Sequence, residues 1–491
     1  MNRRDFLTAA SSAALLPLSG ATWAQAATRP LPIIPITDVT AGGDRRIKLN
    51  LQAATHDFGT GAASATFGIN HSYLGPVVRA KQGQTLPFDV TNGIGEVTTL
   101  HWHGLHIPGE VDGGPHQEIK PGEVWSPDVP VTQRASMNWF HSHMHGKTAR
   151  QTYTGLAGVL LIEDDASLSA DLPSTYGVDD FMLILQDKMF NCSSQMDYVL
   201  TGEVFEEGFT GDTLVVNGAV APVAQTVPQG LVRLRILNAC NARFLTLSLQ
   251  TGPMTVIASD GGFLASSVQT ENILMSPGER YEVLIDTRTA DANALMVSFG
   301  EDEGFVGILG SMFGGGGNAI PALTLNRRAE AGFTGSLPDR LANLSSADST
   351  EATVTRSFQL NMGGSEELAT LATLWGNVCG DGGMGINGRP MKMDRIDEHV
   401  RQGDTEIWRI ASDDQLHPFH IHGCSFRILT QNGAEPPAYA QGWKDMVHVE
   451  NEWSEVLVRF DHPATSDAPY MYHCHILEHE DCGMMGQFTV G

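Results

Sequence analysis

Histidine is concentrated in four short segments of this 491-residue chain. Of its 18 histidines, twelve lie in these segments. Neutral imidazole is a good ligand for copper, zinc, iron and nickel, so the clustering indicates a metal site before it indicates which metal. The segments are His101–His106, His141–His145, His417–His422 and His473–His479.

Eight of these histidines form pairs spaced two residues apart. Side chains two residues apart on an extended strand face the same side, and adjacent side chains face opposite sides. Each pair therefore converges on one side of its strand, and eight imidazoles are more than one tetrahedral zinc uses. A cluster of several metals is the simpler interpretation. The pairs are His101 with His103, His141 with His143, His420 with His422, and His473 with His475.

Cys474 stands between the two histidines of the last pair and is therefore predicted to face away from them. His417 has the opposite parity to its neighbouring pair, and His479 and Met484 follow Cys474 closely. Two histidines, one cysteine thiolate and a weak axial methionine compose the blue-copper electron-transfer site. Adjacent residues of one segment are thus predicted to serve two metal sites, and electrons can cross from Cys474 to the cluster through the backbone.

The remaining histidines are assigned no ligand role. His106 and His145 lie within the segments, but we interpret them as residues that support the ligands or the fold. Met391 and Met393 are more typical of core packing than of a metal site. The isolated histidines are His56, His71, His116, His399, His448 and His462.

The elements that must position these residues are predicted to be strands. Apolar and polar residues alternate at period two between Gly, Pro and Asn in most of the chain, as in 46–51, 231–236 and 455–460. Long helical patterns are scarce. We therefore expect an all-β fold in which sandwiches bury one face of each sheet.

A short turn-and-strand pattern occurs three times, at Gly83–Val90, Gly230–Ile236 and Gly403–Ile410. The intervals are close to one domain each, so the repeat predicts a triplicated β-sandwich. The Gly314–Gly317 run and the polar stretch 345–355 indicate a connection into the third unit. The predicted boundaries are 45–165 for the first domain, 178–325 for the second, 326–356 for the linker and 357–491 for the third.

The N-terminus is predicted to be an export signal. Arg3 and Arg4 precede a weakly hydrophobic stretch that ends in Ala24–Ala26, a small-x-small cleavage pattern. Twin arginines favour the bacterial pathway that exports folded proteins, with an ordinary secretory signal as the alternative. We expect residues 1–26 to be a twin-arginine signal peptide, with the export machinery as a partner and the periplasm as the location.

The charge balance excludes several classes of partner. The formal net charge is −26, from 56 acidic against 30 basic residues. An acidic surface repels phosphate backbones and anionic lipid, so nucleic-acid binding is not expected. Outside the leader, no apolar run reaches the ~18 residues that span a bilayer, and no membrane insertion is expected.

The four histidine segments resemble the copper-binding signatures of the multicopper oxidase family. The likeness extends over essentially the whole mature chain and is greatest to the bacterial copper efflux oxidase and laccase-like three-domain members. The motifs that carry it are His101–Leu105, Gly109–Pro115, Leu416–Gly423 and Leu477–Asp481. It implies three cupredoxin-like Greek-key domains and four coppers per chain, a blue copper in the third domain and a trinuclear cluster between the first and third.

The resemblance also assigns ligands residue by residue. For the blue copper it implies His417, Cys474, His479 and Met484. For the lone cluster copper it implies His101 and His420, and for the coupled pair it implies His103, His141, His143, His422, His473 and His475. The middle repeat continues into Asn238–Phe244 without a histidine pair, which resembles a domain that has kept its sandwich and lost copper.

Three acidic residues acquire roles by the same resemblance. Asp112 and Glu480 are expected to deliver protons to the cluster, although they could instead only orient ligand histidines. Asp413, four residues before His417, corresponds to an acidic substrate contact.

The implied reaction is the four-electron reduction of dioxygen to two waters, driven by one-electron oxidations of a donor. A methionine-rich insertion that feeds cuprous ions in the copper-oxidising members is absent, since residues 318–380 contain only Met362, and Gln415 replaces a helpful methionine. An open blue-copper edge suits phenols and aromatic amines, so a laccase-like activity is expected. The acidic surface keeps a periplasmic cuprous oxidase in copper tolerance as the alternative. A non-enzymatic copper-binding or structural protein is the alternative of another class, which the complete ligand set disfavours.

Overall fold

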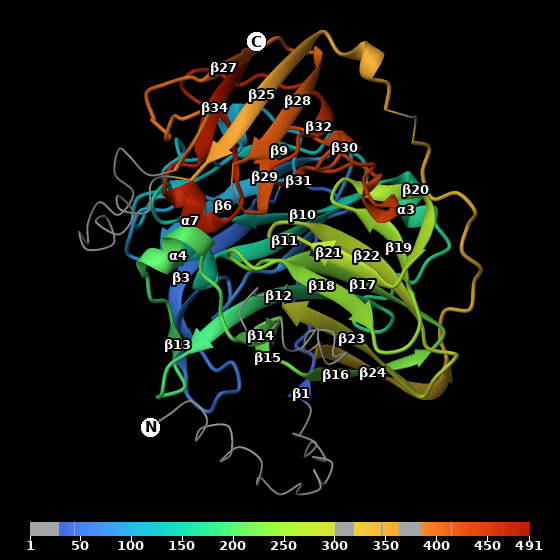
Figure 1. Ribbon diagram of the computed structural model, residues 1–491. Coiled ribbons are helices and arrows are strands. Elements are labelled where there is room, and N and C mark those ends of the chain that lie inside the picture. Colours follow the sequence, from blue (N-terminus) through green and yellow to red (C-terminus); the bar gives the residue numbers. More distant parts are fainter. Residues whose placement is uncertain (1–28, 44, 300–318, 345–346, 363–383, 414) are drawn as a thin grey trace, which may run out of the picture.

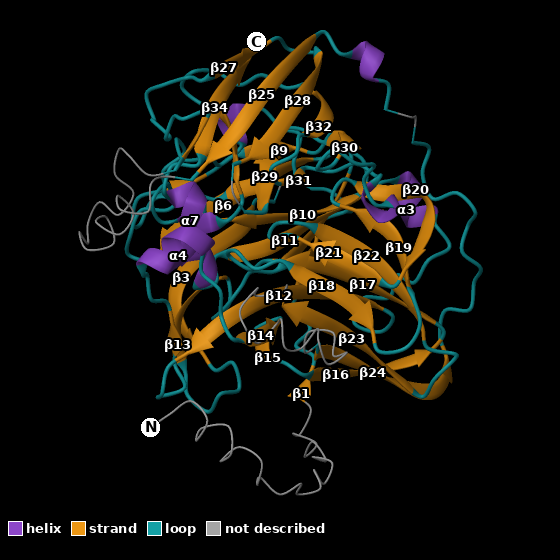
Figure 2. Ribbon diagram, viewed as in Figure 1, coloured by secondary structure: helices purple, strands orange, loops and turns teal. Residues whose placement is uncertain are grey.

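The computed structural model describes residues 29–43, 45–299, 319–344, 347–362, 384–413 and 415–491. The predicted signal peptide and the Gly314–Gly317 run lie outside these residues, as do residues 363–380 of the segment that lacks the methionine-rich insertion. Strands dominate and helices are short (Figure 2), so the all-β prediction is confirmed. Among the described helices, none combines the length and the hydrophobicity that crossing a bilayer requires.

The first domain is a sandwich of two sheets around one apolar core. Its strand β3 alternates buried and exposed side chains along its first half, as expected for a sheet with one face on the core. One sheet has the order β2 (Ile36–Asp38), β5 (Val77–Lys81), β11 (Ala157–Glu163), β10 (Ser136–His141) and β7 (His101–His103). The other contains β4 (Ser64–Ile69), β3 (Ile47–His56), β6 (Thr85–Gly93) and β8 (Val124–Trp125), with β9 (Asp128–Pro130) also paired to β6.

The middle domain is a larger sandwich with its own core. One sheet has the order β1 (Arg29–Pro30), β16 (Val223–Gln229), β24 (Ile320–Ala331), β23 (Ala292–Phe299), β18 (Leu245–Leu249) and β21 (Asn272–Met275). The other has the order β15 (Ala219–Val220), β14 (Thr213–Val216), β12 (Asp180–Phe190), β17 (Leu231–Asn238), β22 (Arg280–Asp286), β19 (Met254–Ser259) and β20 (Gly262–Thr270), with β13 (Met196–Asp197) paired to β12.

The third domain is again two sheets over a single core. One has the order β26 (Gly385–Ile386), β25 (Val354–Asn361), β28 (Thr405–Ser412), β32 (Ser454–Arg459) and β30 (Phe426–Thr430). The other has the order β27 (Glu398–Val400), β34 (Met485–Val490), β33 (Tyr470–Cys474), β29 (His417–Ile421) and β31 (Met446–Val449). Every histidine segment of this domain is therefore on, or directly after, strands β29 and β33.

The three repeated segments occupy the same place in their sandwiches. Strand β6 pairs in parallel with β3, β17 with β12, and β28 with β25. Each also has an antiparallel neighbour on its other side. The repeat seen in the sequence is thus a repeat of topology.

The connection into the third domain is shorter than the predicted linker 326–356. Strand β24 continues to Ala331, and β25 already begins at Val354. The last residues of β24 are mostly polar and do not alternate with apolar residues, which is why the period-two pattern did not predict this part of the strand. The first domain's sheet also begins before residue 45, since β2 pairs with β5.

The helices lie mainly where the domains meet. The α-helices are α2 (Thr148–Tyr153), α3 (Asp165–Ser169), α4 (Gly202–Glu207) and α7 (Leu477–Asp481), and the 3₁₀ turns are η1 (Gly109–Val111), η2 (Ser349–Glu351) and η3 (Ala438–Ala440). In Figure 1, α4 and α7 lie side by side, and contacts join α7 to both α4 and α2. The Asp481 carboxylate accepts hydrogen bonds from the backbone N–H of Thr148 and Ala149 at the start of α2. Helix α7 of the third domain thereby docks on the first.

Candidate metal centres

The first group of donors lies within the third domain. Cys474 Sγ is 3.3 Å from His417 Nδ1 and 3.8 Å from His479 Nδ1, and the two Nδ1 atoms are 3.3 Å apart. Strands β29 and β33 place His417 and Cys474 on neighbouring strands, and the turn of α7 returns His479 to them. Met484 follows directly, with its backbone N–H bonded to the His479 carbonyl and its side chain buried. We call His417, Cys474 and His479 the thiolate site.

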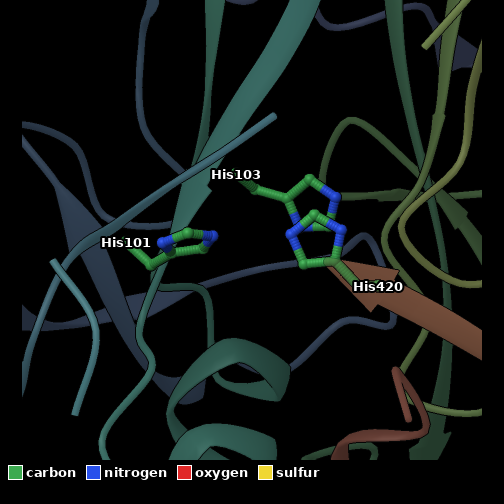
Figure 3. A group of neighbouring side chains, drawn as sticks. All are labelled: His101, His103 and His420. Carbon is green, nitrogen blue, oxygen red and sulfur yellow. The ribbon is translucent and has the colours of Figure 1, made fainter. Parts of the chain in front are cut away.

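The second group is larger and lies between the first and third domains. It contains all eight paired histidines, each almost completely buried. Neighbouring donor atoms form three histidine triads, of which the first two share His103. These are His101 with His103 and His420 (Figure 3), His103 with His141 and His475, and His143 with His422 and His473. We call this group the histidine cluster.

Lone pairs converge in the last triad. His422 Nδ1 donates to Asp112 Oδ2 at 2.8 Å and His473 Nδ1 donates to the Cys474 carbonyl at 2.8 Å. Each of these neutral imidazoles therefore keeps a lone pair on Nε2. The two Nε2 atoms are only 3.2 Å apart, and His143 Nε2 lies 3.2–3.3 Å from both. Facing lone pairs repel one another unless a cation lies between them, so the triad fits a metal ion.

Ring nitrogens without a hydrogen-bond partner indicate metal binding in the rest of the cluster as well. In the described part of the chain, Nε2 of His101, His141 and His420 and Nδ1 of His103 are buried and have no hydrogen-bond partner. Buried polar atoms are normally satisfied, so each exception needs an explanation. A metal ion supplies it, because the other ring nitrogen of each of these histidines is already bonded to protein.

Burial also keeps these imidazoles in their metal-binding form. It lowers the pKa of most cluster histidines well below the usual value, and that of His473 to about 3. At the thiolate site burial lowers the pKa of His417 to about 3. Burial raises the pKa of the Cys474 thiol, because an isolated thiolate is costly in an apolar interior. A soft cation held by neutral imidazoles removes that cost.

The two sites are joined through Cys474, as the strand parity predicted. The Cys474 side chain contacts the thiolate site, whereas His473 lies in the triad of His143 and His475 in the triad of His141. The hydrogen bond from His473 Nδ1 to the Cys474 carbonyl adds a second link. Three consecutive residues therefore connect a sulfur site with a multi-imidazole site.

Sequence profiles described as multicopper oxidase match residues 50–167, 139–306 and 359–491. The chain belongs to the multicopper oxidase family. Membership implies copper binding, and the three domains are the cupredoxin-like domains of this family.

Curated relatives match this chain over its whole length. The "Cell division protein FtsP" of Yersinia pestis is 37% identical, with 100% of this chain and 98% of that protein covered. The protein of the same name in Escherichia coli K12 is 34% identical, with 100% and 99% covered.

Solved structures of oxidases are similar as well. A laccase-like multicopper oxidase CueO from Ochrobactrum sp., described as having oxidase activity towards lignin model compounds, has a TM-score of 0.85 and 41% identity, with 94% of this chain and 100% of that chain covered. A laccase from Pediococcus acidilactici has a TM-score of 0.79 and 29% identity, with 94% of each chain covered.

The two acidic residues expected at the cluster lie against ligand histidines. Besides its bond to His422, the Asp112 carboxylate is 3.3 Å from His101 Nδ1. The Glu480 oxygens lie near two histidines, 3.2 Å from His143 Nδ1 and 3.3 Å from His473 Nδ1. Burial raises the pKa of Glu480 well above its usual range, because a charged carboxylate is costly in the apolar interior.

Other predicted residues lie farther from the donors. Asp413 is exposed and accepts a hydrogen bond from Asn361 Nδ2 at 3.0 Å. His106 contacts Ser425 Oγ at 2.7 Å and His145 is partly exposed, and neither belongs to a donor triad of the described residues.

The expectation of an open blue-copper edge is wrong for the described residues. His479 is fully buried, and its Nε2 donates to the backbone carbonyl of Glu206 in α4 at 3.0 Å. The same carbonyl accepts a bond from Gln415 Nε2 at 2.8 Å, and Phe205 packs into the third domain's core. A helix of the middle domain therefore covers the imidazole, and no local pattern in the sequence indicated this docking.

Sequence reasoning also missed the charged residues around the cluster. Asp445 contacts His103 and His420, and Arg280 of the middle domain pairs with Asp445. His448, to which no role was assigned, contacts Glu279 in the same buried group. Isolated charged residues at such separations carry no periodic signal, so only the fold identifies them.

Proposed function

We propose that this protein is a four-copper oxidase that couples four one-electron oxidations of a donor to the reduction of one dioxygen to two waters. The thiolate site with Met484 is proposed to hold one copper and the histidine cluster three. Bound copper would supply one-electron transfer at the thiolate site and dioxygen reduction at the cluster. Within the cluster, His101 and His420 are proposed to hold one copper. The triads of His103, His141 and His475 and of His143, His422 and His473 are proposed to hold the coupled pair.

The observation that carries this proposal is the completeness of both donor sets on either side of Cys474. A copper store needs soft ligands, but it does not need a sulfur site joined to eight converging imidazoles through adjacent residues. The Cys474 backbone and its bond to His473 form a short covalent and hydrogen-bonded route between the sites. Such a route serves electron transfer.

The acidic residues are proposed to handle the protons of the reaction. Reduction of dioxygen to two waters consumes four protons. The Glu480 carboxyl, whose pKa burial raises, lies 3.2 Å from His143 and 3.3 Å from His473, and the Asp112 carboxylate lies against His101 and His422. The burial of both carboxyls excludes bulk water, so proton transfer there depends on these groups.

Copper analysis combined with oxygen uptake tests the proposal. The purified, copper-loaded protein is expected to hold about four coppers per chain, to show blue absorption, and to consume one dioxygen for four electrons from the donor. Fewer than four coppers after full loading, or no oxygen uptake with any donor, contradicts it.

For the donor, we propose phenols or aromatic amines, so that the activity is laccase-like. The likeness to the Ochrobactrum enzyme, described as acting on lignin model compounds, supports this class. Because Glu206 covers His479, the donor is proposed to bind outside α4 and to pass electrons across the Glu206 peptide.

Cuprous ion in copper tolerance is the second candidate donor. The net charge of −26 attracts cations, and a covered imidazole favours a small donor over a bulky one. Oxygen uptake with dimethoxyphenol and with a cuprous complex, each with and without added cupric ion, separates the two. Phenol oxidation that depends on added copper would favour the cuprous oxidase.

A structural role in the cell envelope is kept as a function of another class, because the curated relatives carry the name of a cell division protein. A strain that lacks the gene, complemented with wild type or with Cys474→Ser, distinguishes the two. Rescue of a division defect by both forms would favour the structural role. Rescue of a copper or phenol phenotype by wild type alone would favour the oxidase.

We further propose that the protein acts in the periplasm after twin-arginine export of the folded, copper-loaded chain. Arg3 and Arg4 are the residues that support this. Fractionation of cells that express the natural chain and an Arg3→Lys, Arg4→Lys double variant tests it. Periplasmic location of both proteins would contradict the proposed route.

A further inference from the structure

A turn of the middle domain reaches the histidine cluster. It connects β21 to β22 and spans residues 276–279. Gly278 adopts φ +85°, and a Cβ at this position would lie 3.2 Å from the His475 ring. Only glycine combines this backbone conformation with so close an approach, so the turn lies directly against a cluster imidazole.

Arg280, at the end of this turn, contacts all three domains. Its two terminal nitrogens donate to the two oxygens of Asp445 in the third domain, each at 2.6 Å. Its Nε donates to the Met137 carbonyl of the first domain at 2.8 Å, and its side chain is fully buried. This planar, two-pronged pairing with a carboxylate is specific to arginine, because lysine offers only a point charge.

Asp445 in turn contacts one ligand histidine from each flanking domain. Its Oδ1 lies 3.1 Å from His103 Nε2, and its backbone carbonyl accepts from His420 Nδ1 at 2.8 Å. These bonds place the ring protons on His103 Nε2 and His420 Nδ1. The opposite nitrogens, His103 Nδ1 and His420 Nε2, are then the lone-pair donors, and they are among the buried atoms without a partner.

The charges around Arg280 form a closed group. Asp260 accepts from the Arg280 backbone N–H at 2.8 Å and pairs with Lys444 Nζ at 3.0 Å, and Glu279 contacts His448 Nε2 at 2.6 Å. A buried carboxylate without a partner is strongly unfavourable. The middle domain supplies this partner to Asp445 in the form of Arg280.

We propose that Arg280 is a positioning residue for the copper cluster. It holds the Asp445 carboxylate, which fixes the tautomer and orientation of His103, and the Asp445 backbone, which does the same for His420. The middle domain, which has no histidine pair of its own, would thereby take part in building the cluster of its neighbours. This inference rests on the proposed three-copper cluster.

Arg280→Lys tests the inference, because it keeps the charge and removes the planar fork. Arg235→Lys is the matched control: Arg235 is a buried arginine of the same domain, and its carboxylate partners, Asp180 and Glu282, also belong to that domain. Copper per chain, blue absorption and the paramagnetic signal of each copper are measured for both variants during competition with a chelator.

The expected result is a loss of cluster copper in Arg280→Lys alone. The apparent affinity of cluster copper should fall by about 10–100-fold, the usual effect of losing a support of a ligand histidine. Blue absorption per chain should stay within about twofold of wild type, because the thiolate site does not contact Arg280. If Arg280→Lys fails to fold, Asp445→Asn, which keeps the shape and loses the charge, is expected to give the same selective loss.

Two other outcomes have distinct meanings. If wild type binds four coppers and Arg280→Lys retains cluster copper as tightly, the positioning role is wrong and the proposed function stands. If wild type itself takes up only the blue copper, the proposed function fails at the cluster and the role of Arg280 fails with it. Equal copper loss in Arg235→Lys would show a general packing effect and would overturn the inference.

Discussion

The thiolate site and the histidine cluster differ in how many domains build them. All three donors of the thiolate site come from β29, β33 and α7 of one domain. Each triad of the cluster mixes histidines of the first and third domains, and its supports include residues of the middle one. The donors of the first site therefore come together once one sandwich has folded, whereas those of the second come together only when the first and third domains dock.

Cys474 takes part in both sites. It belongs to the thiolate site by its side chain and to the cluster by its two neighbours and its carbonyl. A single strand end thus links a site formed within one domain to a site formed between domains.

Replacing this link should have the largest effect. Cys474→Ser removes the thiolate and is expected to abolish blue absorption and to lower oxygen uptake by about a hundredfold or more, since loss of a supporting residue alone costs about 10–100-fold. Cys424→Ser is the control, because this buried cysteine lies in the same domain outside the donor group. Blue colour that survives in Cys474→Ser shows that the ligand assignment is wrong.

Glu480→Gln is expected to affect the reaction at the histidine cluster and not the thiolate site. The neutral amide keeps the size of the side chain but cannot deliver a proton, so oxygen uptake is expected to fall by about a hundredfold, while blue absorption stays unchanged. The rate at which the reduced protein is reoxidised by oxygen is the measurement. Glu480→Asp, which retains a carboxyl, should recover part of the rate. Full activity in Glu480→Gln would mean that this carboxyl only orients His143 and His473.

Gln415→Ala tests how firmly the middle domain covers the thiolate site. It removes one of the two hydrogen bonds to the Glu206 carbonyl, so kcat/KM for a phenol is expected to change by about two- to tenfold, the worth of one bond. The reaction with oxygen at the cluster should not change. An unaltered kcat/KM would indicate that the His479 bond and the packing of Phe205 hold α4 without Gln415.

Lys188→Met tests a contact between the first and middle domains. The expected effect is on the pH dependence of the free energy of unfolding. The Lys188 ammonium donates to the Tyr153 carbonyl at 2.6 Å, and burial lowers its pKa to about 7. Between about pH 7 and 10.5 the unfolded chain binds a proton that the folded chain lacks, so the stability contribution rises with pH and is constant below pH 7.

Removing Lys188 should remove this slope, which is at most about 1.4 kcal/mol per pH unit. The measurement is denaturant unfolding of the copper-free protein from pH 7 to 10. Identical slopes in wild type and Lys188→Met contradict the lowered pKa.

Much of the fold and of the donor sets could be predicted because both rest on local periodicity. Strand parity at His473, Cys474 and His475 is a property of any extended chain, so the division into two faces needed no coordinates. The alternation in 46–51 and 231–236 likewise predicted β3 and β17. The end of β24 has no apolar alternation, and its extent to Ala331 was missed.

Contacts between domains were beyond such reasoning. The cover of His479 by Glu206 joins residues 273 positions apart, and the pair of Arg280 with Asp445 joins residues 165 apart. Neither pair follows a motif, because a single hydrogen bond or ion pair places no periodic constraint on the surrounding residues. The first contact bears on the proposed electron donor, and the second on the proposed support of the cluster.

The amino-acid sequence by itself determined that this chain forms three β-sandwiches and carries two adjoining sets of metal donors, since backbone geometry converts residue spacing directly into side-chain direction. Only the tertiary structure decided how the histidines divide into triads, which carboxylates hold them and what covers the thiolate site. These features arise where separate domains meet, and their positions follow from the packing of whole sandwiches rather than from the spacing of residues along one strand.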